Sequence, residues 1–321
     1  MSFSISLALT VILIPLVIRY RIIDKPNYRS IHTRETPKAG GIAILLGLLG
    51  GLFISGQGTA LLGLSLLMVG ATTLGLLDDL KNLSPNAKLI AQLALALLTT
   101  AGGYQFVLFG NLLDTAITVI WIIGLMNAFN LIDGMDGLAG GVAGIATLIF
   151  FALGVPSLET IALPLLGAIL GFLIYNFRPA KIFMGDTGSM LLGYLLAVMG
   201  ILVQRSAESP WVGGAVTLLI LAYPLFDTAL SIIRRKANHK PIFAPDRSHS
   251  YNLLMDHLGL GYLTTVFTVY GVTACGGLLS FLTYTRQSLA LAAISLIVVI
   301  ATMIIFVARY HLLAESRYEK H

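Results

Sequence analysis

Carboxylates set between strongly apolar segments are the residues of this 321-residue sequence that could do chemistry. Residues 127–141 read N-A-F-N-L-I-D-G-M-D-G-L-A-G-G and join two segments apolar enough to cross a membrane. Acidic side chains close to hydrocarbon are costly to keep, which favours a functional role. Steps of three separate Asn127, Asn130, Asp133 and Asp136, so a helix would present all four on one face. We interpret this stretch as one wall of a polar site.

A second stretch contains two adjacent acids, Asp78 and Asp79, in L-L-D-D-L-K-N-L-S-P-N-A-K. On a helix they diverge by about 100°, so both can face one ligand only where the helix ends. Adjacent carboxylates repel each other, which favours a proton acceptor or a metal neighbour. Ser84 and Pro85 predict the start of the next helix, with Lys88 a turn further in. A solvated helix end is the alternative.

Two glycine-containing turns could meet phosphate groups. Asp186 follows Gly185 in Y-N-F-R-P-A-K-I-F-M-G-D-T-G-S-M, where free backbone N–H groups at a helix N-terminus suit a metal-bridged diphosphate. The alternative is that Asp186 only caps the helix. Lys38, in T-P-K-A-G-G, adds a point charge for phosphate. Its alternative roles are to enforce topology or to touch lipid headgroups.

The longest basic loop, about 233–258, follows Asp227 and contains Arg247 and His249. Arg247 and His249 form a constellation able to bind phosphate; the alternative for His249 is an incidental loop histidine with no role in the site. Asp227 lies about two turns before Arg234, so a structural ion pair is the alternative to a role in substrate binding.

The acids favour a hard metal ion. There is one cysteine, Cys275, and no convergent set of histidines, so Mg²⁺, or Mn²⁺, suits the site better than zinc. A metal and carboxylates beside basic residues suggest the transfer of a phosphorylated group from a soluble donor to a lipid acceptor.

Composition predicts an all-α integral membrane protein that forms one polytopic domain over residues 1–321. The sequence is 57% hydrophobic and 11% charged, with a mean hydropathy of +0.89. Repeated apolar runs match the length that a bilayer requires of a helix. We predict about eleven transmembrane helices, at residues 2–18, 40–57, 60–77, 88–107, 114–130, 137–155, 160–176, 188–204, 211–232, 260–282 and 288–308.

Basic residues predict the orientation. Of the 20 lysines and arginines, all but Arg205 and Arg286 fall on one side of this topology. Because lysine and arginine mark the cytoplasmic face, we place the N-terminus outside and the C-terminus in the cytoplasm. Arg19 and Arg21 follow the first segment in place of a small-residue cleavage site, which predicts an uncleaved first helix.

The L-L-D-D, N-A-F-N-L-I-D-G-M-D-G-L-A-G-G and Y-N-F-R-P-A-K-I-F-M-G-D-T-G-S-M motifs closely resemble those of the polyprenyl-phosphate N-acetylhexosamine-1-phosphate transferases. The resemblance runs in order from Thr36 to His249. It implies transfer of a HexNAc-1-phosphate, most simply GlcNAc-1-phosphate, from a UDP-sugar to undecaprenyl phosphate, with release of UMP and use of Mg²⁺. It also implies a cytoplasmic active site in the plasma (inner) membrane and a role in cell-envelope glycans such as O-antigen or teichoic acid.

The resemblance assigns roles by position. Asp186 matches a metal ligand and Lys88 a phosphate-binding lysine. Asp78 and Asp79 match a catalytic pair, one of which would deprotonate the lipid phosphate; an older proposal is a covalent route through an aspartate. Four residues match positions on the side of the family's active site that holds the nucleotide and the metal: Asn130, Asp133, Asp136 and Asn176.

One motif departs from the family pattern. The usual H-x-H-H in the last loop reads His249-Ser250-Tyr251-Asn252 here, so only the first histidine of that motif is present. The phospho-MurNAc-pentapeptide transferases of peptidoglycan synthesis are relatives with ten helices and an external C-terminus. The eleventh predicted helix and the cytoplasmic tail favour the GlcNAc branch.

Other classes fit less well. An ion-coupled transporter predicts acids near helix centres and repeat symmetry. A CDP-alcohol phosphotransferase needs an arginine and further acids after its D-G motif, and a prenyl synthase needs two D-D-x-x-D motifs. The expected partners are a UDP-HexNAc donor, undecaprenyl phosphate and the membrane, with no nucleic acid. A homodimer is left open.

Overall fold

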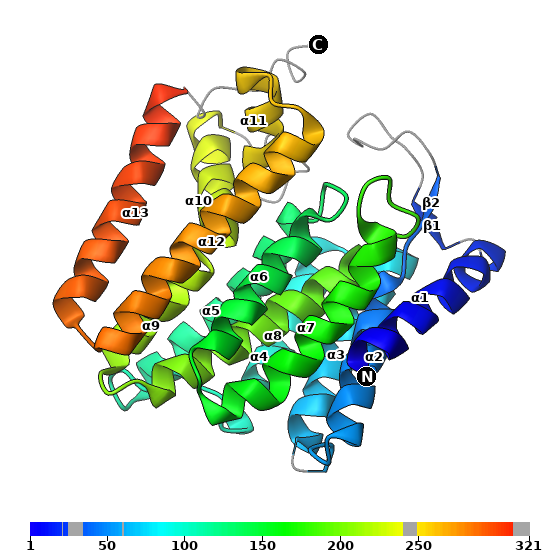
Figure 1. Cartoon of the computed structure of the whole chain (residues 1–321), viewed down its shortest axis with the longest axis horizontal. Helices are drawn as coiled ribbons and strands as arrows, with labels where there is room; N and C mark the ends of the chain where they lie inside the picture. Colours follow the sequence, from blue (N-terminus) through cyan, green and yellow to red (C-terminus); the bar gives the residue numbers. More distant parts are fainter. Residues whose placement is uncertain (21, 25–34, 60, 240–248, 311–321) are drawn as a thin grey trace.

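The computed structural model describes residues 1–20, 22–24, 35–59, 61–239 and 249–310, and these fold as a bundle of helices (Figure 1). Every predicted helical segment corresponds to a helix or to a pair of helices. In chain order the elements are α1 (Ser2–Arg19), β1 (Ile23–Asp24), β2 (Thr36–Pro37), α2 (Gly40–Ile54), α3 (Leu62–Lys81), α4 (Pro85–Ala101), α5 (Leu112–Ile132), α6 (Leu138–Ala152), α7 (Pro156–Asn176), α8 (Gly185–Ser206), α9 (Pro210–Ile220), α10 (Ala222–Ala237), α11 (Ser250–Leu258), α12 (Tyr262–Arg286) and α13 (Leu289–Arg309).

Most of these helices are long and apolar enough to cross a bilayer. By length and composition, seven of the described helices could cross a membrane, or eight if α9 and α10 form one bent span. Two shorter apolar helices, α2 and α6, pack among them. The chain is therefore a helical membrane protein with several spans. The count of eleven spans and the sidedness of the termini stay predictions.

The predicted helix at 211–232 is interrupted. It divides at Leu221 into α9 and α10, whose axes are bent by 75°. Pro224 explains the break, because it has no N–H to donate to the carbonyl of Ile220 and its ring would crowd that carbonyl. In the first turn of a new helix the missing N–H costs nothing, so α10 restarts there.

Three small elements, one helix and two strands, were not predicted. Residues 250–258, which we interpreted as part of a loop, form α11. Strands β1 and β2 pair antiparallel, with Ile23 opposite Pro37. The start of α4, which the Ser84-Pro85 pair predicts, is confirmed: the hydroxyl of Ser84 accepts the N–H of Ala87 at 3.3 Å and so caps the helix.

Helix α8 is the centre of the bundle. It is buried along almost its whole length and packs against α2, α3, α5 and α9. In Figure 1 it lies in the middle, with α1 at one edge and α12 and α13 at the other. Helices approach closely in membranes where small residues meet, and Gly193 of α8 lies against the backbone of Leu125 in α5. This packing fixes the position of the α8 N-terminus, which contains Asp186.

Candidate active site

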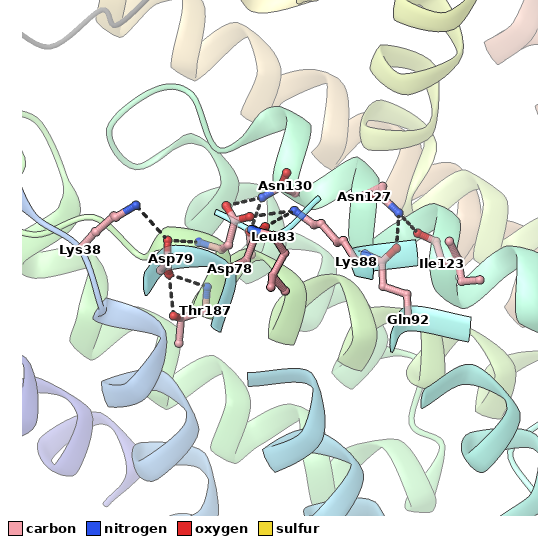
Figure 2. A network of polar contacts seen from close by, with 12 residues as sticks. Lys38, Asp78, Asp79, Leu83, Lys88, Gln92, Ile123, Asn127, Asn130 and Thr187 are labelled. Carbon is pink, nitrogen blue, oxygen red and sulfur yellow. Dashed lines mark hydrogen bonds and ion pairs between the residues drawn. The ribbon is translucent and has the colours of Figure 1, made fainter. Parts of the chain in front are cut away.

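A cluster of charged side chains surrounds the N-terminus of α8 (Figure 2). Lys88, from the first turns of α4, lies at its centre: its Nζ is 2.8 Å from Asp78 Oδ2 and 2.7 Å from Asp186 Oδ2. Asn130 of α5 donates to the other oxygen of Asp186 at 2.6 Å and to Ser189 Oγ at 3.2 Å. Four helices thus bring together residues that are far apart in the sequence, such as Lys88 and Asp186, which are 98 positions apart.

Asp79 points away from Lys88 and accepts hydrogen bonds from the start of α8. Its Oδ2 accepts the N–H and the hydroxyl of Thr187 at 3.0 and 2.6 Å, and its Oδ1 accepts the N–H of Asp186 at 3.2 Å. Lys38 Nζ lies 3.4 Å from the same carboxylate. A carboxylate at the positive end of a helix dipole is stabilised there. Asp79 therefore holds the first turn of α8, while its neighbour Asp78 faces Lys88. The two side chains point in different directions, as expected for adjacent residues on a helix.

Asp133 ends α5 and lies within the electrostatic field of the cluster. Burial, and then the negative charges of Asp186, Asp79 and Asp136, raise the pKa of Asp133 well above its usual range. Its backbone N–H donates to the carbonyl of Asn130 at 3.4 Å, but its carboxylate has no hydrogen-bond partner among the described residues. A cation beside Asp133 and Asp186 would relieve this repulsion.

Asp136 has a different environment. Helix α5 ends at Ile132, so the helical spacing does not continue to Asp136 and the predicted single stripe is wrong for this residue. Its Oδ2 accepts the N–H of Ala180 at 3.1 Å, and its own N–H donates to the hydroxyl of Tyr262. Arg178 stacks on that tyrosine, 3.6 Å from the ring centroid. Asp136 joins the loop after α5 to the loop after α7.

Two of the predicted asparagines also join neighbouring segments. Asn176, which is buried, accepts the N–H of Gly137 at 3.1 Å and donates to the carbonyl of Ile182 at 3.0 Å. Asn127 lies one turn deeper than Asn130 and donates to Gln92 Oε1 at 2.9 Å, not to the acids (Figure 2). Both side chains position the loops and helices that carry the cluster.

The remaining predicted residues lie on α10 and beyond it. Asp227 is fully buried and pairs with His249, at 2.9 Å between Oδ2 and Nδ1. Asp227 is therefore paired, but with His249 and not with a basic residue of its own helix. Arg247 lies outside the described residues.

Sequence reasoning did not single out several residues that complete this arrangement. The hydroxyl of Thr187 is one, and its position directly after Asp186 at a helix start was the available signal. Gln92 is another: it follows Lys88 by four positions, so a helix places both on one face. Tyr262, which contacts the 133–137 loop, left no signal because it is 126 positions away from Asp136.

The donor atoms of the cluster suit a hard cation. In the described part of the chain, no group of three His, Cys, Asp or Glu side chains converges as a complete metal cage. Mg²⁺ does not require one, because it is commonly held by one or two carboxylates, waters and substrate phosphates. The crowded acids Asp186 and Asp133, with oxygen donors only, fit that mode of binding.

The close approach of α3 to α8 gives a test of this geometry. A Cβ added to Gly75 would lie 2.2 Å from the carbonyl oxygen of Asp186. We expect Gly75→Ala to displace the start of α8, to destabilise the protein by about 1–3 kcal/mol or more, and to lower activity about 100-fold. Thermal unfolding in detergent and initial rates would measure both effects.

Gly63 is the matched control, since it is on the same helix and nothing lies within 4 Å of an added Cβ. Gly63→Ala should leave both quantities near wild type. Wild-type activity in Gly75→Ala would show that the packing of α3 on α8 does not position Asp186.

Comparison with known proteins adds a second line of evidence. Residues 61–204 match the sequence model of Glycosyl transferase family 4. The chain is 34% identical over 290 residues to the "Probable undecaprenyl-phosphate N-acetylglucosaminyl 1-phosphate transferase" of Bacillus subtilis. This alignment covers 84% of this chain and 80% of that protein. It is 32% identical to the "Decaprenyl-phosphate N-acetylglucosaminephosphotransferase" of Mycobacterium tuberculosis, over 87% of this chain and 81% of that protein.

A third relative, the "Undecaprenyl-phosphate alpha-N-acetylglucosaminyl 1-phosphate transferase" of Thermotoga maritima, is 32% identical over 79% of this chain and 80% of its own length. The region matched by the family model contains the cluster residues of α3, α4, α5 and α8. Lys38, Asp227 and His249 lie outside that region.

Proposed function

The chain belongs to Glycosyl transferase family 4, and on that premise we propose that it transfers GlcNAc-1-phosphate from UDP-GlcNAc to a polyprenyl phosphate, releasing UMP. The observation that carries this proposal is the cluster of Lys88, Asp78, Asp186 and Asn130 at the N-terminus of a buried membrane helix. It combines cations for phosphates with carboxylates for proton and metal chemistry, while the N–H groups of Asp186 and Thr187 at the helix start are already bound by Asp79.

The cluster suits a reaction in which two anions must meet. Lys38 and Lys88 supply positive charge, and the N-terminus of α8 adds the positive end of its dipole. Holding both phosphates in register converts a bimolecular encounter into an intramolecular step. The site lies at the ends of α3, α5 and α8, which are long and apolar enough to span a membrane. At a membrane border, a lipid acceptor and a soluble donor can both reach it.

In the proposed reaction an oxygen of the acceptor phosphate attacks the β-phosphorus of UDP-GlcNAc. A new phosphorus–oxygen bond forms, and the bond from the β-phosphorus to the bridging oxygen breaks. UMP leaves with that oxygen and its electron pair, and the product is a polyprenyl diphosphate linked to GlcNAc. A carboxylate of the Asp78–Asp79 pair takes up the proton of the acceptor phosphate.

Mg²⁺ is part of this proposal. Asp186, with Asp133 beside it, would hold the ion together with the donor diphosphate. When bound, the ion would neutralise charge on the diphosphate. Mn²⁺ supplies the same oxygen coordination.

The purified protein in detergent tests the function directly. With UDP-GlcNAc, undecaprenyl phosphate and Mg²⁺, UMP should appear only when both substrates are present. A parallel screen of UDP-HexNAc sugars would identify the preferred donor, and we expect UDP-GlcNAc to lead. If no UDP-sugar yields UMP while a radiolabelled solute crosses liposomes that contain the protein, the transporter alternative is correct.

We also propose the orientation and the cellular role. The charge distribution supports a cytoplasmic active site in the plasma membrane, with an external N-terminus and a cytoplasmic C-terminus. The acceptor named for two of the reported relatives, undecaprenyl phosphate, supports a role in initiating a cell-envelope glycan such as O-antigen or teichoic acid. A homodimer, which the sequence leaves open, is not part of this proposal.

Cysteine labelling tests the orientation. Lys81 lies at the end of α3 beside the start of α8, whereas Arg205 lies near the end of α8. The 22 residues of α8 rise about 33 Å, which is close to the thickness of a bilayer core. In a variant that lacks Cys275, we expect an impermeant maleimide added to intact cells to label Arg205→Cys and not Lys81→Cys. The reverse pattern would invert the topology.

A further inference from the structure

Three residues of α10 form a stripe that faces the start of α11. Tyr223, Asp227 and Ser231 are spaced by four, so they share one face of the helix. The hydroxyl of Tyr223 lies 3.1 Å from Ser250 Oγ, and Ser231 Oγ lies 3.4 Å from His249 Nδ1. Asp227, between them, is 0% exposed. A buried carboxylate is costly unless it is paired and hydrogen-bonded, so the partners of Asp227 define its role.

Both oxygens of Asp227 are committed to adjacent residues. Its Oδ1 accepts the backbone N–H of Ser250 at 2.6 Å, at the first residue of α11. Its Oδ2 lies 2.9 Å from Nδ1 of His249. An ionised carboxylate can only accept hydrogen bonds, so Nδ1 of His249 carries the proton.

The other nitrogen of His249 is left open. Nε2 has no hydrogen-bond partner among the described residues. It is also not fully buried, so a bound molecule can reach it. The ring stacks on Tyr251, with centroids 5.5 Å apart. The hydroxyl of Tyr251 in turn donates to the carbonyl of Leu131 at 3.4 Å, at the end of α5. His249 is thereby attached to the segment that precedes Asp133.

We propose that Asp227 is a positioning residue, which fixes the proton of His249 on Nδ1 and leaves Nε2 as the atom through which His249 meets the nucleotide sugar. The same arrangement of a buried carboxylate, an imidazole Nδ1–H and an open Nε2 orients histidines in other active sites. The kinetic part of this proposal rests on the proposed function, whereas the position of the proton does not.

Asp227→Asn is the sharpest test, because asparagine provides one oxygen and one NH₂ group. The N–H of Ser250 can be met only by the oxygen, so the NH₂ group faces Nδ1 of His249. Nδ1 must then accept, and the proton moves to Nε2. In ¹⁵N-histidine NMR spectra assigned by comparison with His249→Gln, we expect the Nδ1–H tautomer in the wild type and the Nε2–H tautomer in the variant.

We expect kcat/KM of Asp227→Asn to fall by on the order of 10²–10⁴-fold, and the double variant with His249→Gln to be no worse than His249→Gln alone. The control is Tyr223→Phe, which removes an anchor of α11 without touching His249 and should change activity less than about threefold.

Additive losses in the double variant would show that Asp227 supports the fold only, and an Nε2–H tautomer in the wild type would overturn the proposal. A wild-type protein without transferase activity would contradict the proposed function, while the NMR result would still decide the position of the proton.

Discussion

Asp186→Asn should lower the rate of UMP release by on the order of 10³-fold and leave the protein folded. Asp186 Oδ2 accepts from Lys88 and Oδ1 accepts from Asn130, and asparagine would turn one of these contacts into a clash between donors. The substitution also removes the charge that we propose for holding Mg²⁺. Asp79 still accepts the N–H groups at the start of α8, so the helix should keep its position.

Initial rates at saturating substrates, a Mg²⁺ titration and thermal unfolding in detergent would separate these effects. EDTA should abolish wild-type activity, and added Mg²⁺ should restore it. Glu159→Gln is the matched control, because it removes the same charge from an exposed position at the start of α7. Near-wild-type turnover in Asp186→Asn would remove this residue from the metal site.

Lys88→Met should produce the second large loss, by on the order of 10²–10³-fold in kcat/KM. Methionine has a similar length but no charge, so Asp78 and Asp186 would lose the cation that lies between them. The proposed phosphate contact would disappear as well. Breaking a partly buried ion pair also leaves an uncompensated charge, so a lower unfolding temperature should accompany the loss of activity.

Two further variants make the Lys88 test specific. Lys81→Met removes a positive charge from an exposed position at the end of α3 and should retain activity within about threefold. Lys88→Arg keeps the charge but replaces a compact ammonium with a planar fork, and should recover only part of the activity. Full activity in Lys88→Met would exclude Lys88 from phosphate binding.

The helices were predictable because the apolar runs that a bilayer demands are also the runs that fold as helices. The exceptions have local causes. Pro224 divides one predicted helix into α9 and α10, and α11 follows a basic stretch that reads as a loop. The length of a hydrophobic run does not count membrane spans, since α2 and α6 are apolar but short.

The site was predictable where its residues lie at helix ends. One end of each of α3, α4, α5 and α8 lies at the cluster. The five predicted residues at these ends therefore come together: Asp78, Asp79, Lys88, Asn130 and Asp186.

The sequence could not separate residues that contact the cluster from those that support it. Asp136 and Asn176 hold loops, and Asp227 holds His249, through contacts between segments 22 to 44 positions apart that no helical period reveals.

In the proposed reaction this cluster transfers a sugar phosphate and not a sugar alone. UDP-GlcNAc labelled with ³²P at the β-phosphate, incubated with the purified protein, undecaprenyl phosphate and Mg²⁺, distinguishes the two reactions. We expect the label to enter the lipid product in a 1:1 ratio with unlabelled UMP. Release of labelled UDP with unlabelled sugar on the lipid would show transfer of the glycosyl group alone and contradict the claim.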